Sequence, residues 1–149
     1  MTSASNRMWH RFEIIELLHA IEICIDQRDV DGFASHLSRD ARYEGPFGTH
    51  HGRAAIREMS RVHHESGSML GKRRMTGPMR VSVDGNHASA YSHWWVAEAH
   101  DTPGVYSTGT YEDTLERVGD RWLVTERKMT IDPSWKGQPP PKPASSRSA

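Results

Sequence analysis

The segment that most restricts the fold runs from Val105 to Ile131 and has the composition of two long β-strands. Tyr, Thr, Val and Trp favour strands and fill both arms, while Gly119-Asp120 between them is typical of a tight hairpin turn. Each arm is about twice as long as an average strand. A ribbon of this length has to twist and curve, so we expect an apolar layer to cover its concave face.

Three earlier segments have the pattern of helices that would supply this layer. From about Arg7 to Arg28, apolar residues recur at helical spacing, and a polar stripe that includes Glu22 and Asp26 runs against them. Asp29 is a suitable N-cap for a short second helix. A third helix is predicted from Arg53 to about Glu65, with one side apolar.

The rest of the chain has the pattern of strands and turns. A short strand is predicted at Asp40–Glu44, before a turn-rich loop. From Lys72 onwards the sequence pattern repeats every two residues, as in a strand with one buried face. Asp84-Gly85-Asn86 predicts a hairpin that leads into a strand from Ala88 to His100. The sequence therefore predicts an α+β fold in which a curved antiparallel sheet wraps around helices as a cone-shaped barrel. We expect this domain to span residues 1–133, and the Pro- and Ser-rich residues 134–149 to form a flexible tail.

Composition excludes several classes of function. A chain of 149 residues fits one domain, and its 19 basic and 19 acidic residues balance, so we expect no nucleic-acid partner. No apolar run is long enough for a membrane span, and the N-terminus lacks a signal-peptide core. The single cysteine, Cys24, fits a reducing cytoplasm. Because HExxH, HxH and CxxC motifs are absent, we predict neither a metal site nor a cofactor.

Several short motifs occur together in one order. They are Ile25-Asp26-Gln27-Arg28-Asp29, then Ala41-Arg42-Tyr43-Glu44-Gly45 with Gly52-Arg53-Ala54-Ala55-Ile56, and finally Gly109-Thr110-Tyr111, Glu116-Arg117, Gly119, Trp122 and Asp132-Pro133. In this combination the chain resembles the SnoaL-like family, part of the nuclear transport factor superfamily of curved α+β cones. The resemblance implies an apolar pocket inside the cone. It also implies activities such as those of cofactor-free dehydratases, isomerases, dehydrohalogenases, epoxide hydrolases and polyketide cyclases.

The resemblance also points to a catalytic pair. In relatives similar to scytalone dehydratase or the hexachlorocyclohexane dehydrochlorinase, an aspartate at the position of Asp26 assists a histidine on the first long strand. Here that position holds Arg73 or Arg74. A guanidinium does not deprotonate near neutral pH, so it cannot be the base. Such an arginine would lower the pKa of Asp26, stabilise an enolate or bind a substrate carboxylate.

The residues themselves suggest which side chains would do the chemistry. Asp26 lies at a helix C-terminus among apolar neighbours, which would raise its pKa towards that of a base, although it could instead pair with an arginine. His93 shares a strand face with Tyr91 and Trp95, either as a pocket residue or as a core histidine. Adjacent histidines at positions 63 and 64 are interpreted as the solvated end of the third helix.

Three further polar residues could face the pocket. Tyr43 and Tyr111 could each polarise a carbonyl or only pack against their neighbours. Arg127 could pair with an acidic residue across the Gly119-Asp120 hairpin, Glu112 or Asp113, or contact the substrate.

We therefore predict a cofactor-independent lyase or isomerase acting on a small hydrophobic cyclic substrate. Asp26 and His93 are the predicted catalytic residues, and the predicted substrate-binding residues are Tyr43, Arg74, Tyr91, Trp95, Tyr111 and Arg127. Two alternatives remain: a non-catalytic binder of an apolar ligand, or an interaction protein similar to an oxygenase small subunit. We also expect a homodimer or trimer formed across the outer sheet face, where Trp94 or Trp95 and Val96 would otherwise be exposed.

Overall fold

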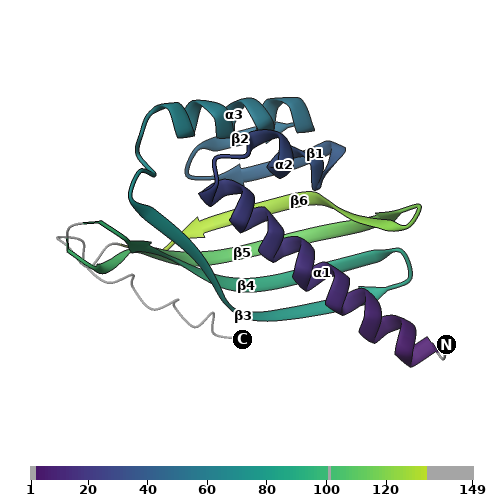
Figure 1. Cartoon of the computed structure of the whole chain (residues 1–149). Coiled ribbons are helices and arrows are strands. Elements are labelled where there is room, and N and C mark those ends of the chain that lie inside the picture. The colour runs from purple at the N-terminus through teal and green to yellow at the C-terminus, as the bar shows by residue number, and fades with distance from the viewer. Residues whose placement is uncertain (1–2, 101, 134–149) are drawn as a thin grey trace, which may run out of the picture.

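A computed structural model of the chain describes residues 3–100 and 102–133 (Figure 1). The predicted tail, residues 134–149, lies outside the described residues. In chain order the elements are α1 (Ser3–Asp26), α2 (Val30–Ser35), β1 (Leu37–Gly45), β2 (Gly48–His51), α3 (Arg53–Glu65), β3 (Lys72–Asp84), β4 (His87–Glu98), β5 (Gly104–Val118) and β6 (Arg121–Ile131).

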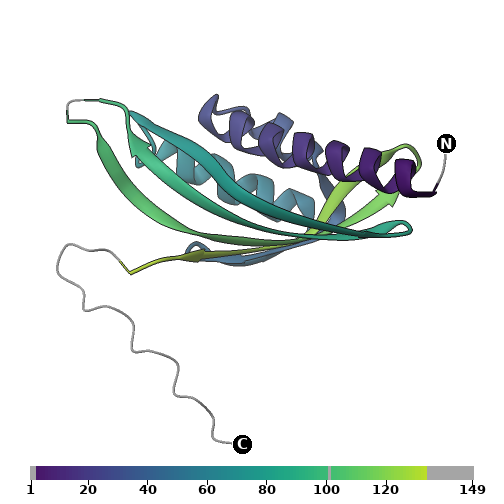
Figure 2. The ribbon, with the colours of Figure 1, turned by 90° about the horizontal axis from the view of Figure 1, so that it is seen from below.

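The strands form one six-stranded sheet in the order β2-β1-β6-β5-β4-β3. The sheet is curved but not closed, and the three helices lie on its concave side (Figures 1 and 2). This confirms the predicted α+β class. Every neighbouring pair is antiparallel except β1 and β6, which run parallel. No helix in the described part of the chain is long and apolar enough to cross a membrane.

One local prediction was incomplete. The turn-rich loop predicted after Glu44 contains a further strand, β2, around His50 and His51, and β2 pairs with β1 from Gly45 and Gly48 onwards. Gly48 has a φ of 95°, a conformation that glycine adopts without strain, and it allows the chain to reverse after only two residues. The predicted hairpin of β5 and β6 is confirmed, with Val118 paired to Arg121 across the turn.

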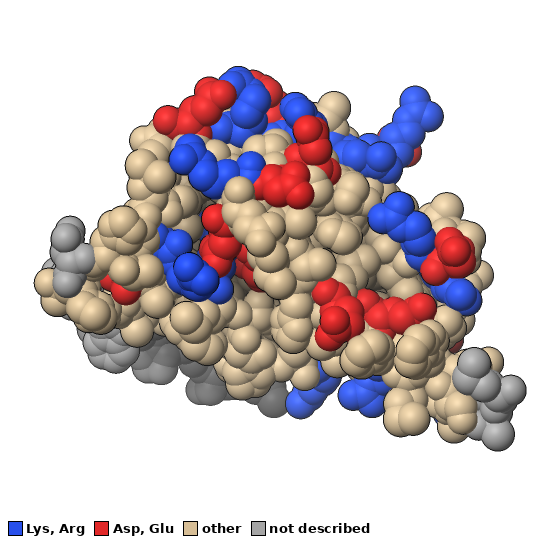
Figure 3. Space-filling model, in the orientation of Figure 1, with Lys and Arg blue, Asp and Glu red and all other residues tan. Residues whose placement is uncertain are grey.

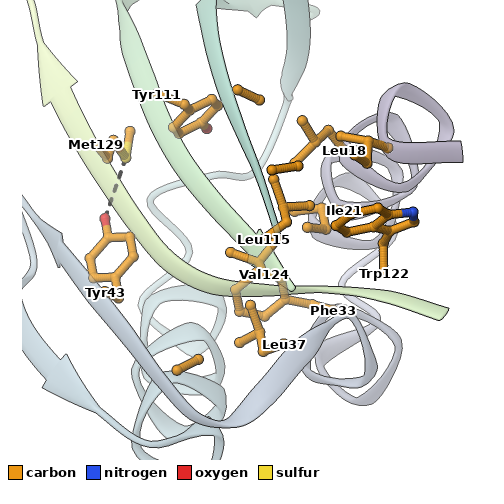
Figure 4. Packing of buried hydrophobic residues seen from close by; sticks show 14 of the residues in the cluster. Leu18, Ile21, Phe33, Leu37, Tyr43, Tyr111, Leu115, Trp122, Val124 and Met129 are labelled. Atoms are coloured by element: carbon orange, nitrogen blue, oxygen red, sulfur yellow. Dashed lines mark hydrogen bonds between the residues drawn. The ribbon is translucent and has the colours of Figure 1, made fainter. Parts of the chain in front are cut away.

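The core lies between α1 and the concave face of the sheet. Ile14, Leu18 and Ile21 of α1 are almost fully buried, as are the facing strand residues Leu115 and Val124 (Figure 4). Burying each aliphatic side chain contributes roughly 1.5–3 kcal/mol before entropy is counted. On the helix-covered face, acidic and basic side chains are interspersed (Figure 3).

Two β-bulges change which residues face inward. On β3, Thr76 pairs with Trp94 and Met79 pairs with Ser92, so three steps on β3 match two steps on β4. The extra residue at 77–78 reverses the alternation, because side chains in a strand otherwise change face at every step. The buried Val81 would place Arg73 inward by simple alternation, but the bulge turns Arg74 inward instead.

The second bulge lies on β6. Asp113 pairs with Arg127 and Leu115 pairs with Val124, so three steps on β6 match two on β5. As a result, Val124 and Arg127 both face the interior although they are an odd number of residues apart. This bulge brings a guanidinium into the cone.

Candidate functional site

A cavity of two adjacent chambers, which share part of their lining, opens between α3, the β1–β2 turn and the concave sheet face. The outer chamber has a volume of about 340 Å³ and the inner one about 40 Å³. Phe47, His63, Arg74 and Met129 line both chambers. Most of the remaining wall is apolar, which is typical of a small-molecule site with a few polar groups.

His63, in the last turn of α3, has an unpartnered nitrogen at this cavity. Its Nδ1 lies 3.4 Å from the Ser68 hydroxyl, and the Phe47 ring packs at 4.3 Å between centroids. Its Nε2 is buried without a hydrogen-bond partner. Burial lowers the pKa of His63, and the positive charge of Arg74 and the neighbouring His64 lower it further. The imidazole is therefore neutral at pH 7 and can accept a proton.

Arg74 is held by its backbone, while its side chain extends along the cavity. Its backbone N–H donates to both carboxylate oxygens of Asp26, at 3.0 and 3.2 Å. In the described part of the chain, the guanidinium has one hydrogen-bond partner, the sulfur of Met69 at 3.8 Å, and the Nε atom is buried without a partner. Among the described residues no carboxylate forms an ion pair with it. Asp26 thus positions Arg74 but leaves the guanidinium uncompensated.

Asp26 itself lines a separate, smaller pocket beside the cavity. This pocket has a volume of about 120 Å³ and includes Arg28, His64 and Lys72 among its lining residues. His64 and Ile25 also line the inner chamber, so the two spaces share a wall. Asp26 does not line either chamber of the main cavity.

The two predicted tyrosines lie at the inner chamber and differ in their partners. The Tyr43 hydroxyl donates to the sulfur of Met129 at 3.3 Å (Figure 4), a weak acceptor. Burial raises the pKa of Tyr43 to about 12, so the phenol stays protonated and keeps its donor. Tyr111 donates to Glu22 at 3.4 Å. Tyr43 is therefore the hydroxyl that is more easily redirected to a ligand.

Arg127 lines the inner chamber, but its guanidinium has internal partners. It donates to both oxygens of Asp113, at 2.7 and 3.0 Å, and to Glu22 at 3.1 Å. It also lies 4.1 Å above the centre of the Tyr111 ring. All four side chains are buried, so this cluster is a compensated charge network inside the cone. Of the two predicted ion-pair partners of Arg127, the structure selects Asp113.

The prediction that Tyr91, His93 and Trp95 face the cavity was wrong. These residues lie on the opposite face of β4, where Tyr91 is 44% exposed and packs edge-on against His93. The inward residues of β4 are Ala88, Ala90, Ser92, Trp94 and Val96. An alternating strand presents two equally regular faces, so the sequence pattern alone does not show which of them is buried.

Three side chains that the sequence pattern placed at the surface are buried or half-buried. Glu22 was placed on the polar stripe of α1 but is only 5% exposed; it follows Leu18 by four residues and precedes Ile25 by three. His63 and His64 were interpreted as solvated, but His64 is only 7% exposed and His63 is half-buried. His64 follows the buried Ile56 by eight residues and His63 follows Met59 by four, so helical spacing could have identified all three.

The described part of the chain contains no group of three or more His, Cys, Asp or Glu side chains arranged to hold a metal ion. The polar groups of the cavity are the imidazoles of His63 and His64, the guanidiniums of Arg74 and Arg127, and the hydroxyls of tyrosine and serine side chains. Such groups suit proton transfer and hydrogen bonding to an oxygen.

Comparisons with solved structures give the same fold. A nuclear transport factor 2-like protein from Novosphingobium aromaticivorans is 26% identical, with a TM-score of 0.78 over 91% of this chain and 89% of that one. A protein of unknown function from Mycobacterium tuberculosis is 23% identical, with a TM-score of 0.80 over 89% and 77%. A scytalone dehydratase candidate from N. aromaticivorans is 16% identical, with a TM-score of 0.74 over 86% and 87%.

Sequence comparison identifies the family. No curated protein matches the chain. The family model for the SnoaL-like domain matches residues 6–128, which is most of the chain and includes every element apart from the first residues of α1 and the end of β6. This chain therefore belongs to the SnoaL-like family.

Proposed function

We propose that this protein is a cofactor-independent lyase or isomerase that transfers a proton on a small hydrophobic cyclic substrate. The main support is the buried, unpartnered Nε2 of His63 beside the two chambers. A buried polar atom without a partner costs stability, so its presence at a cavity favours a ligand that supplies the partner. This assigns the role of base to His63 in place of His93.

The chemistry follows from the properties of two side chains. His63, neutral because its pKa is lowered, removes a proton from the carbon next to a substrate carbonyl. The electron pair of the broken C–H bond forms the enolate, and the Tyr43 hydroxyl turns from the Met129 sulfur to donate to the enolate oxygen. The imidazolium then returns the proton to another carbon, giving an isomer, or to a departing hydroxyl, giving an alkene and water. Asp26 acts in this proposal as a positioning residue.

Deuterium exchange tests this proposal without requiring the natural substrate. Cyclic and aromatic ketones are incubated with the protein in D₂O, and exchange at the carbon next to the carbonyl is followed by NMR. We expect exchange above the buffer rate that falls at least about 100-fold in His63→Gln. His93→Gln is the matched control, because His93 lies on the outer face. Equal losses in both variants, or no exchange with any ketone, would contradict the assignment.

A non-catalytic binder would use the same chambers. For such a binder, the wild-type protein would bind a ligand saturably and catalyse no deuterium exchange. The affinity for the ligand would be the same in His63→Gln.

The expected assembly and location also remain proposals. Trp95 and Tyr91 form part of an outer sheet face that a second copy would cover, whereas Trp94 and Val96 are already buried inside the subunit. We propose a homo-oligomer through this face and a cytoplasmic location, the latter supported by the unpaired Cys24. Light scattering of Trp95→Glu against the wild type tests the first, with a smaller particle expected.

A further inference from the structure

The Arg74 side chain lacks a counter-ion, which restricts the class of ligand. We infer that the cavity takes an anionic substrate, a small cyclic or aromatic carboxylate whose charge pairs with the Arg74 guanidinium. This inference rests on the proposed function only in taking the two chambers as the substrate site. It adds the ionic character of the substrate, which the proton-transfer chemistry does not require.

The nearest cationic side chains already have anionic or carbonyl partners. Arg127 is bound by two carboxylates, Lys72 lies 3.6 Å from Glu98, and Arg28 donates to the backbone carbonyl of His64 at 2.8 Å. Arg74 differs from all three because, among the described residues, the only hydrogen-bond partner of its side chain is the Met69 sulfur, at 3.8 Å. A thioether is a weak acceptor and carries no charge.

Within residues 3–100 and 102–133, no other group near Arg74 neutralises its charge. Both Asp26 oxygens accept from the Arg74 backbone, and they form no ion pair with the guanidinium. His63 and His64 both have lowered pKa values, first through burial and then through nearby cations that include Arg74. They are therefore neutral at pH 7. Taking a charge out of water is costly unless it is paired, so an arginine held this way favours an anionic ligand.

The shape of the site fits a ring that carries one carboxylate. Arg74 lines both chambers, so a group bound to it can extend into either. The outer chamber is otherwise largely apolar, with lining residues that include Met69, Val96, Met129 and Ile131. A guanidinium can bind a carboxylate through two parallel hydrogen bonds, which orients the ring as well as holding it.

Matched ligands test the inference by binding alone. The probes are cyclohexanecarboxylate, benzoate and 2-naphthoate, each paired with its neutral carboxamide and titrated by calorimetry into the full chain. For at least one ring we expect the carboxylate to bind at least about tenfold more tightly than the amide, because a charge-assisted pair is stronger than a neutral hydrogen bond. Arg74→Gln should abolish this preference, and Arg74→Lys should keep part of it. Arg73→Gln is the control, since Arg73 is exposed on the other face of β3.

Unfolding of the ligand-free protein separates a binding role from a structural one. If Arg74 is kept for a ligand, Arg74→Leu should raise the melting temperature, because it removes an unpaired charge without breaking an ion pair. Added carboxylate should raise the melting temperature of the wild type but not of this variant. A lower melting temperature in Arg74→Leu, no carboxylate preference in the wild type, or an equal loss in Arg73→Gln would overturn the inference.

The two proposals can fail separately. A carboxylate preference that depends on Arg74, without any deuterium exchange, would leave the ligand class standing and remove the proton-transfer role. The opposite result is deuterium exchange on neutral ketones that Arg74→Gln leaves unchanged, with no preference for carboxylates. It would keep the proton-transfer role and remove the anionic ligand class.

Discussion

The Asp26 carboxylate accepts the backbone N–H of Arg74 with both oxygens and forms no ion pair with the guanidinium of that residue. It therefore joins the end of α1 to the start of β3. Asp26→Asn keeps one acceptor oxygen but loses the charge, so we expect a loss of about 1 kcal/mol in unfolding free energy. Proton exchange should fall by far less than the roughly 100-fold or more that follows removal of a general base. If the exchange rate of a folded Asp26→Asn protein falls by roughly 100-fold or more, as expected for removal of a general base, then Asp26 is the base.

Tyr43 should matter more for chemistry than for stability. In Tyr43→Phe only a weak hydrogen bond to Met129 is lost, so the unfolding free energy should change by less than about 1 kcal/mol. Without a donor for the enolate oxygen, the exchange rate should fall roughly 100-fold. Urea unfolding and the deuterium assay measure the two quantities. A rate equal to that of the wild type would remove Tyr43 from the mechanism.

The buried charge network should be sensitive to loss of its cation. Arg127→Met leaves Glu22 and Asp113 buried without their partner, and we expect a loss of about 3–5 kcal/mol in unfolding free energy. Arg42→Met is the control, because the Arg42–Glu44 pair at 3.2 Å is exposed and should contribute little. Similar unfolding curves for the two variants would contradict the proposed importance of burial.

Stability should fall as the pH drops below neutrality. His36, His63 and His64 all have pKa values lowered mainly by burial, from an unfolded value of 6.5. Around and below that value the unfolded chain binds more protons than the folded one at these sites, so the unfolding free energy rises with pH in this window and levels off above it. Urea titrations at pH 5.5 and 7.5 measure the difference, which His64→Gln should reduce. A stability that does not change between these two pH values would contradict the prediction.

Gly109 is expected to tolerate no side chain. A Cβ there would lie 2.5 Å from the Trp94 ring, besides meeting the Thr130 carbonyl. Because backbone cannot move aside cheaply, Gly109→Ala should cost about 1–3 kcal/mol and shift the Trp94 ring at the outer chamber. Gly104→Ala is the matched control on the same strand, since nothing lies within 4 Å of its added Cβ. Equal melting temperatures for the two variants would show that the sheet adjusts at Gly109.

Elements in which apolar residues recur at regular spacing, or which end at a clear turn motif, could be predicted from the sequence. The third helix has the predicted bounds of Arg53–Glu65, and the long hairpin turns at Gly119-Asp120 as expected. In both cases local propensity and turn chemistry agree with the final structure. The parallel pairing of β1 with β6 could not be predicted in this way, because it depends on contacts between distant parts of the chain.

The errors in the candidate site concern which face of a strand is buried and where a bulge shifts the pairing of neighbouring strands. A strand pattern predicts that residues alternate, but not which set faces the core, and so His93 was placed on the wrong side of β4. Simple alternation also fails at a bulge. The bulge at residues 77–78 turns Arg74 inward, and the one on β6 turns Arg127 inward. Gly77-Pro78 could have located the bulge on β3, because both residue types are typical of bulges inside a strand. The segment from Val124 to Arg127 on β6 contains neither residue type, so its extra step could not be located from the sequence.

The parallel pairing of β1 with β6 also determines the order in which the protein can be completed during synthesis. In the described sheet β1 has only β2 and β6 as neighbours, and β6 is the last of the six strands in chain order. Until β6 is synthesised, β1 and β2 cannot join the rest of the sheet. Contacts between residues so far apart in sequence slow folding and leave strand edges exposed in the meantime. A nascent chain that ends before residue 121 therefore exposes the edges of both β1 and β5, which β6 later covers.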